Sequence, residues 1–247
     1  MPPGSFLMGS PESEEGRYPE EEDPQHTVRL THGFWLGETT CTQAQWESVM
    51  GENSSENKGD MLPVENVSWT MVQKFCESLN NRFKDGDLLD PEAVFRLPSE
   101  AEWEYACRSE GGKDSAFNDG SACTVPDGHD PALDRLGWFR ENSGKKTHPV
   151  AGKEPNERGL YDMHGNVWEW CLDGWREYED KEQKDPLGSM EADARRVLRG
   201  GSAWDDARDC RSACRIQIDP GNRSRDGGFR LASGQPPGSG ATGRSEG

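Results

Sequence analysis

The residues of this 247-residue chain that could carry chemistry gather in one stretch, RGGSAWDDARDCRSACR, which runs from Arg199 to Arg215. Its two cysteines, Cys210 and Cys214, stand among clustered arginines and aspartates. Paired thiolates bind soft metal ions and act as nucleophiles, whereas arginine, aspartate and tryptophan are typical of surfaces that recognise a partner. The stretch is therefore either a catalytic thiol site or a recognition surface.

Three helices are predicted from their first residues. Residues 42–51 begin with a capping box and end at a glycine, a natural helix stop. Residues 68–83 begin at a serine and carry apolar side chains spaced three and four apart, so one stripe faces the interior. A third helix is expected from Ser99, directly after Pro98.

Short strands are predicted near both ends of the chain, at residues 5–9, 26–37, 166–173, 196–201 and 228–232. We therefore expect the sheet to close by bringing the chain ends together. The pair Gly200 and Gly201 allows close approach of two segments and places the following residues at an exposed strand end. Residues 233–247 are rich in Gly, Pro and Ser and are predicted to be a flexible tail.

The composition narrows the class of protein. Hydrophobic residues make up 31% of the chain, beside 29 glycines and 16 prolines, which favours a loop-rich fold in which nine tryptophans supply much of the core. A net charge of −18 argues against nucleic acid as a partner, and no apolar run is long enough to span a bilayer. The acidic run Glu12–Pro24 is expected to be a solvated loop. The seven cysteines lack CxxC spacing, and an odd number leaves at least one thiol unpaired.

Five motifs follow one another along the chain: PPGSFLMGS, RLPSEAEWEYACR, GLYDMHGNVWEWCLDGW, RVLRGGSAW and GGFRLA. In this order they resemble the formylglycine-generating-enzyme (sulfatase-modifying factor) family, a variety of the C-type lectin fold. The resemblance implies a loop-rich α+β fold with short antiparallel strands and about three helices, in a single domain over residues 1–232. The family contains copper-dependent oxidases, iron-dependent sulfoxide synthases and binding proteins without catalysis, so the fold alone does not decide the function.

In the oxidases, the resemblance implies a copper ion held by two cysteines that follow the serine of RGGS. Counting from Ser202, the second of these positions is Cys210, but the first is Asp205. A carboxylate is a hard ligand that cannot replace a thiolate on soft Cu(I), so no copper is expected. A different pair, Cys210 with Cys214, is an alternative, and so is a purely structural role as small buried hydrophobes. The five histidines form no HxxxH pair, so no iron is expected.

Residues 196–232 also resemble the variable segment of Treponema-type variable proteins of diversity-generating retroelements, which use the same lectin-type fold. In such proteins a framework is kept, and the residues between its pieces form a solvent-facing binding surface. The framework corresponds here to Arg199–Ser202, Cys210–Ala213, Arg215, Pro220, Asn222, Arg223 and Gly228–Ala232. The resemblance places the contact residues at Trp204, Asp205, Asp206, Arg208, Asp209, Cys214, Ile216, Gln217, Ile218, Asp219, Ser224, Arg225 and Asp226.

The chemistry of these contact residues suits recognition, because they combine apolar anchors with a polar rim. Trp204 and Ile216 could bury in a partner, while Arg208 and Arg225 could bind carboxylates. We therefore expect a non-enzymatic, receptor-like monomer that binds an unidentified protein or glycan through the surface of residues 203–227. The alternatives are a metal-dependent oxidase of the formylglycine-generating type and a structural accessory protein.

The family pattern also implies a structural calcium ion at GLYDMHGNVWEW, between the side chains of Asp162 and Glu169 and the carbonyls of Gly165 and Val167. An all-oxygen shell suits this hard cation, which would fix an irregular loop. The alternative is strand alternation, with the flanking tryptophans in the core and Glu169 facing solvent. The resemblance further implies a cell-surface or secreted location, with an export or anchor segment upstream of these residues.

Overall fold

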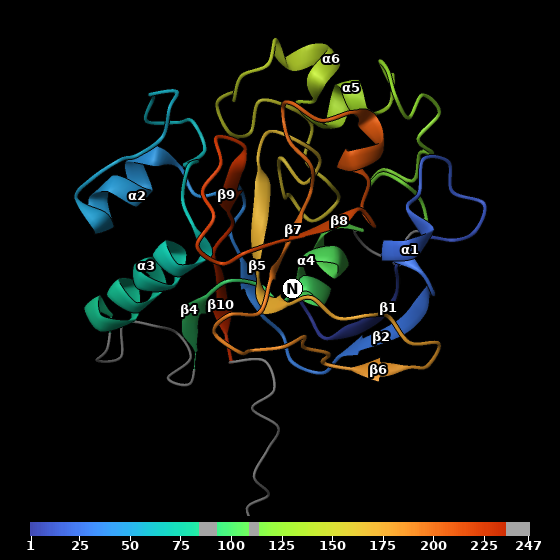
Figure 1. Cartoon of the computed structure of the whole chain (residues 1–247), viewed down its shortest axis with the longest axis horizontal. Helices are drawn as coiled ribbons and strands as arrows, with labels where there is room; N and C mark the ends of the chain where they lie inside the picture. The colour runs from blue at the N-terminus through green and yellow to red at the C-terminus, as the bar shows by residue number, and fades with distance from the viewer. Residues whose placement is uncertain (84–92, 109–113, 236–247) are drawn as a thin grey trace, which may run out of the picture.

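Helix α4 (Glu100–Cys107) lies near the centre of the computed structural model, which describes residues 1–83, 93–108 and 114–235 (Figure 1). All eight of its residues are buried. The helix packs against strands β1 and β2 of one sheet and β5 and β7 of another. The predicted loop-rich α+β fold is confirmed by this mixture of small sheets and short helices.

The described strands form three small sheets, with orders β1-β2-β6, β3-β10-β4 and β8-β7-β5-β9. Most neighbouring strands are antiparallel, whereas β2 with β6 and β5 with β9 run parallel. The third sheet carries the segment singled out by the sequence. The strands are β1 Gly4–Met8, β2 His26–Leu30, β3 Trp35–Leu36, β4 Val94–Arg96, β5 Trp168–Gly174, β6 Gln183–Lys184, β7 Arg196–Arg199, β8 Arg215–Ile218, β9 Gly227–Phe229 and β10 Ala232–Gly234.

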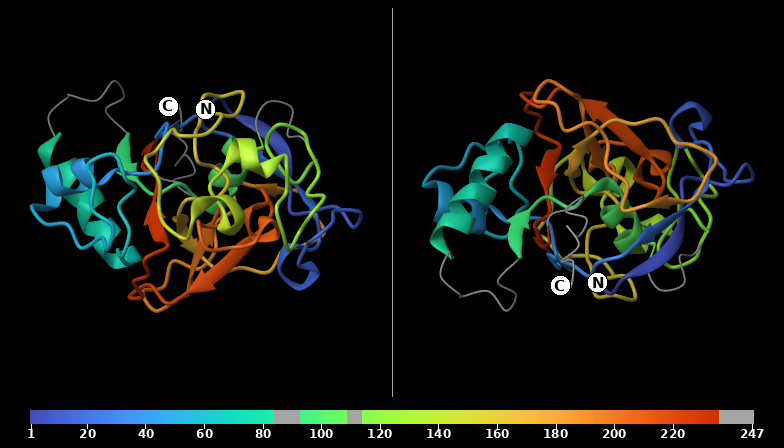
Figure 2. Two further views of the ribbon diagram at one scale, coloured as in Figure 1. Left: turned by 90° about the horizontal axis from the view of Figure 1, so that it is seen from above. Right: turned by 90° about the horizontal axis from the view of Figure 1, so that it is seen from below.

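The three predicted helices are confirmed. Helix α2 (Gln43–Met50) has its capping box at Thr42 and ends at Gly51, whose φ of 75° is left-handed. Helices α3 (Trp69–Arg82) and α4 begin directly after their serine caps. Seen from above, α2 and α3 form one side of the molecule, separated from the main body by β9 and β10 (Figure 2). Single turns too short to show a period were not predicted: α1 Pro19–Glu22, α5 Leu133–Leu136, α6 Arg140–Ser143 and the 3₁₀ turn η1 Ala207–Cys210.

Some strand predictions were wrong. The chain ends do not join in one sheet, because β1 pairs with β2 along five residues and β10 lies between β3 and β4. The segment 26–37 is broken between β2 and β3, and the short strands β4, β6 and β8 were not predicted. Strand β10 includes Ser233 and Gly234, which we assigned to the tail, while residues 236–247 lie outside the described part of the chain.

The acidic segment is not solvated throughout, contrary to the prediction. Glu22 is completely buried, and its two carboxylate oxygens accept hydrogen bonds from the Arg211 guanidinium at 2.9 and 2.5 Å. Glu14 contacts the same guanidinium at 2.5 Å. Local composition could not reveal this, because Arg211 lies 189 residues further along the chain than Glu22.

The other buried arginines of the predicted framework are held in the same way. Each forms an ion pair with a buried glutamate from another element: Arg215 with Glu100, Arg199 with Glu104 and Arg230 with Glu169. Burial alone would raise the pKa of Glu100, but the charges of Arg215 and Arg199 outweigh burial and lower this pKa. Both charges are therefore kept inside the fold, and each pair fixes one point of residues 199–230.

Breaking one of these pairs should be costly. Arg211→Met leaves Glu22 buried without its partner, so the free energy of unfolding at pH 7 should fall by about 3–5 kcal/mol in urea denaturation. Although burial would raise the pKa of Glu22, Arg211 lowers it, so the pair stabilises the fold above the ordinary glutamate pKa. This contribution is lost as the pH falls through the lowered pKa, and the deficit of the variant should shrink in acid.

The control is Arg195→Met. Arg195 pairs with Asp219 at 3.5 Å, and both side chains are exposed. A solvated pair of this kind contributes little, so the control should change the free energy of unfolding by less than about 0.5 kcal/mol. Equal losses in the two variants would show that the buried pair does not fix the segment.

Candidate functional site

A glycine pair turns the chain out of β7 and into the candidate site. Gly200 and Gly201 have φ angles of 95° and 71°, both in the left-handed region. A Cβ on Gly201 would lie only 2.6 Å from Cys210 Sγ and 2.8 Å from the carbonyl oxygen of Asp209. Glycine at this position therefore allows η1 to pack closely against the end of β7, and the following residues return along β8.

A pocket of about 220 Å³ opens on the sheet formed by β8, β7, β5 and β9. Four of its lining residues, Ile216, Ile218, Ser224 and Asp226, are predicted contact residues, so the structure brings strand β8 of the contact segment together with the segment's last residues. The pocket combines apolar and polar groups. Its other lining residues are Trp168, Trp170, Leu198, Asn222, Arg223 and Gly227.

Sequence reasoning missed several of these lining residues. It placed the tryptophans of β5 only in the core, and Asn222 and Arg223 in the framework. Strand parity could have identified the rings, because residues two apart share one face, and Trp168 and Trp170 lie opposite the newly found strand β8 across β7. The intervening Glu169 is completely buried, so the alternative in which it faces solvent is wrong.

Trp204 and Arg225 come from opposite ends of the segment and meet at the surface. The Arg225 guanidinium lies over the Trp204 ring, 5.1 Å from its centroid. Arg140 of α6 supports this loop from outside the segment: its Nε donates to the Trp204 carbonyl at 2.9 Å, and its guanidinium pairs with Asp206 at 2.6 Å. The stack adds an aromatic and a cationic group to the face that carries the pocket.

Asp205 connects the loop to the pocket. Its carboxylate accepts hydrogen bonds from Trp168 Nε1 at 2.8 Å and from the Ser202 hydroxyl. Burial and the neighbouring charges of Asp209 and Asp226 together raise the pKa of Asp205 to about 6, although the hydrogen bonds from Ser202 and Trp168 act in the opposite direction. This side chain therefore gains a proton at a higher pH than an ordinary aspartate.

Not every predicted contact residue is available to a partner. Arg208 is tied to the rest of the fold, with Nη1 3.2 Å from Asp127. Cys214 does not belong to the surface: it is 1% exposed and packs in the core cluster beside the pocket tryptophans, which corrects its assignment. Gln217 is half-buried, and Asp219 is exposed.

The two thiols of the segment are poorly suited to catalysis. Cys210 and Cys214 are free and buried. Burial raises the pKa of Cys210 well above its ordinary value, and the nearby charges of Asp205 and Asp209 raise it further. Since the thiolate is the form that attacks and binds metals, this environment disfavours both reactions. Within residues 1–83, 93–108 and 114–235, no three His, Cys, Asp or Glu side chains are grouped to hold a metal ion.

The side chains implied in calcium binding fit the ion only in part. Asp162 Oδ2 accepts a hydrogen bond from the Ala151 amide at 2.8 Å, while Oδ1 is buried without a hydrogen-bond partner. A buried oxygen of this kind could serve as a ligand to a cation. The Glu169 carboxylate already accepts hydrogen bonds from the Arg230 guanidinium at 2.8 and 3.0 Å and from Trp103 Nε1 at 2.7 Å. Asp162 is thus the better candidate ligand, and Arg230 already balances the charge of Glu169.

The chain belongs to the sulfatase-modifying factor enzyme 1-like (FGE-sulfatase) domain family, whose pattern matches residues 1–234. The chaperone protein LppX of Paenibacillus barcinonensis is 33% identical over an alignment of 182 residues, and the match covers 60% of this chain and 64% of that protein. The formylglycine-generating enzyme of Mus musculus is 32% identical over an alignment of 221 residues, and the match covers 86% of this chain and 54% of that protein. The chain thus spans between about half and two thirds of the length of these relatives.

Among solved structures, Treponema denticola variable protein 1 is similar to this chain with a TM-score of 0.77 and 32% identity, over 94% of this chain and 92% of that one. Both parts of the predicted resemblance, to the formylglycine-generating-enzyme family and to a Treponema variable protein, are confirmed. Proteins named as enzymes and one named as a variable protein therefore share this fold. The described part of the chain contains no helix that is both long and apolar enough to cross a membrane.

Asp205 should make stability depend on pH. Its folded pKa of about 6 lies above that of an unfolded aspartate, so its contribution is present at low pH and is lost as the pH rises through 6. Between pH 5 and pH 7 this amounts to about 1 kcal/mol. Asp205→Asn keeps an acceptor oxygen for Ser202 and Trp168 but cannot titrate, so its free energy of unfolding should depend less on pH than that of the wild type.

The measurement is urea denaturation of both proteins at pH 5 and pH 7. Asp219→Asn, at an exposed position of the same segment, is the matched control and should retain the wild-type difference. The same pH dependence in Asp205→Asn and the wild type would contradict a buried, titrating Asp205.

Proposed function

We propose that this protein is a receptor-like binding protein, without catalysis, that presents exchangeable side chains of residues 203–227 on a fixed scaffold. The observation that carries this proposal is the division within a single segment. Four framework arginines are buried in ion pairs with distant glutamates, whereas several contact residues remain partly or fully exposed. The buried arginines are Arg199, Arg211, Arg215 and Arg230, and the exposed contact residues include Trp204, Ile216, Ile218 and Arg225. The side chains that could vary are thus separate from those that hold the backbone.

The face formed by these residues has the features of a protein or glycan contact surface. Two isoleucines border a small pocket backed by tryptophans, and the Trp204–Arg225 stack adds an aromatic group and a cation. Aromatic and arginine side chains carry much of the binding energy at interfaces. A backbone held by buried pairs loses little freedom on binding, so affinity would come from pre-organisation.

Although some relatives are named as enzymes, the residues of this chain at the implied copper site do not favour catalysis. Asp205 stands where the resemblance requires the first copper thiolate, and it is engaged with Ser202 and Trp168. The remaining thiol, Cys210, is completely buried. We therefore propose that no copper is bound, and stoichiometric uptake of Cu(I) that disappears in Cys210→Ser would contradict this.

The proposal is tested by the binding capacity of the face. In a display library, the residues to be randomised are Trp204, Ile216, Ile218, Ser224 and Arg225. Selection against hen egg-white lysozyme, a defined protein probe, should yield folded variants with a dissociation constant of about 1 µM or lower, because the scaffold does not depend on these side chains.

The control library carries the same diversity on exposed positions of α2, α3 and the turn after α2. These positions are Glu47, Glu52, Lys74, Glu77 and Asn81. It should yield few or no binders, since these positions belong neither to the pocket nor to the Trp204–Arg225 stack. No enrichment from the first library, or equal enrichment from both, would refute the proposed display surface.

We also propose that calcium binds at Asp162 and stabilises the loop that leads into β5. The buried Oδ1 without a partner supports this, and the pKa of Asp162, which burial raises to about 6, shows the cost of leaving the carboxylate uncompensated. Addition of 1 mM Ca²⁺ to chelator-treated protein should raise the melting temperature by a few degrees, roughly the effect of 1–2 kcal/mol of binding energy.

The matched variant is Asp162→Asn, which keeps the shape of the side chain but weakens the ligand. It should show a smaller calcium-dependent shift than the wild type, and Mg²⁺ should not reproduce the shift because it demands a tighter octahedral shell. A wild-type melting temperature that does not change on addition of calcium would contradict the proposed calcium site.

A further inference from the structure

A second pocket is lined in part by α2 and α3. These two helices stand on the opposite side of β9 and β10 from most of the molecule (Figure 2). The pocket's volume of about 470 Å³ is about twice that of the pocket on the contact face. Its lining comes from α2, α3 and Phe83 directly after it, β4, the segment after β3 and Leu231 directly before β10, and it includes no residue from 203–227. It is therefore a separate site, within the size range of small-molecule pockets.

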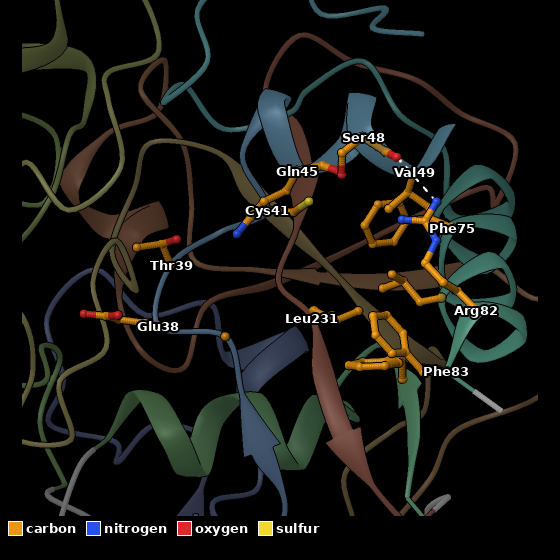
Figure 3. A pocket seen from close by; sticks show the side chains of 13 residues that line it. Glu38, Thr39, Cys41, Gln45, Ser48, Val49, Phe75, Arg82, Phe83 and Leu231 are labelled. Carbon is orange, nitrogen blue, oxygen red and sulfur yellow. Dashed lines mark hydrogen bonds between the residues drawn. The ribbon is translucent and has the colours of Figure 1, made fainter. Parts of the chain in front are cut away.

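The inner wall of this pocket is apolar. Phe75 and Leu79 are buried on the inward face of α3, Leu231 faces them from beside β10, and Phe83 packs on Phe95 with the ring centroids 5.8 Å apart (Figure 3). Phe83 is nevertheless 36% exposed. Large rings that line a cavity and remain accessible to water are stabilised when an apolar ligand covers them.

One cation stands at the edge of this apolar wall. The Arg82 side chain lies above Phe75 and points toward α2, where it donates to the Ser48 carbonyl at 3.5 Å (Figure 3). Within the described part of the chain, Arg82 forms no ion pair with an acidic side chain. Glu38, the carboxylate among the lining residues, lies across the pocket and points away from Arg82 in Figure 3. The guanidinium therefore keeps donors that an anion could use.

We propose that this pocket binds an amphipathic monocarboxylate, with its aliphatic tail on the phenylalanine wall and its carboxylate on Arg82. The planar guanidinium matches a carboxylate in a two-bond arrangement, which a neutral head group cannot form. The exposed hydroxyl of Ser48 and amide of Gln45, both on α2, line the same rim and add polar contacts for the head group. A small acid satisfies the apolar wall and the cation together, whereas a hydrocarbon or an alcohol satisfies only the wall.

The test is titration calorimetry of the full chain with decanoate and with decanol at pH 7. The wild type should bind decanoate at least about tenfold more tightly than decanol, because only the acid pairs with Arg82. Arg82→Gln should weaken decanoate binding about tenfold and leave decanol binding unchanged. Arg82→Lys, which keeps the charge but loses the planar fork, should lie between the two.

The matched control is Lys74→Gln, which removes another exposed cation of α3 that does not line the pocket. It should bind decanoate as the wild type does, which excludes a general effect of net charge. Absence of decanoate binding, equal affinity for the acid and the alcohol, or unchanged decanoate affinity in Arg82→Gln would each overturn the proposal. Because Arg82 is exposed, its replacement should leave the fold intact, and the melting temperature of each variant verifies this.

Discussion

The constraint on which the structure depends is the neutralisation of arginines inside the fold. Strands β7 and β8 pair so that Arg199 stands directly opposite Arg215, an arrangement of like charges that is unfavourable by itself. Helix α4 resolves it by supplying Glu104 to Arg199 and Glu100 to Arg215. These glutamates are one helical turn apart, so a single buried helix fixes both β7, which leads into the contact segment, and β8, which carries part of it.

Buried ion pairs are weak evidence for stability, because desolvation offsets most of their attraction, but they can determine register. A shift of β8 against β7 by one residue would move Arg215 away from Glu100 and leave two charges uncompensated in the core. Arg211 adds a third fixed point through Glu22, and Arg230 a fourth through Glu169. The chain between these points can therefore change its exposed side chains without changing its path.

The sequence predicted what local signals encode and missed what distant partners decide. The serine and threonine caps located α2, α3 and α4, and the order of the motifs identified the family. Strand β8 was missed because RIQI is only four residues long, although the turn residues Asp219–Asn222 follow it directly. Glu22 was assigned to solvent because its partner is remote in sequence, and Cys214 was assigned to the surface because the resemblance gives a position, not a burial. The pocket tryptophans were recognised as core rings, but their role required knowing that β8 lies two strands away.

The same residue that removes a copper ligand also shapes the binding face. Asp205 accepts hydrogen bonds from Trp168 Nε1 and the Ser202 hydroxyl, so its carboxylate connects the Trp204 loop to a ring that lines the pocket. A thiolate in place of this carboxylate would be a weaker hydrogen-bond acceptor. Copper binding by such a thiolate would also require an accessible Cys210, whereas Cys210 is buried where η1 packs on the glycine turn. The burial of the Cys210 thiol and the fixing of the Trp204 loop are thus two results of one packing arrangement. Under the proposed function, the region where the resemblance places the copper ligands of the oxidases holds a surface in place instead.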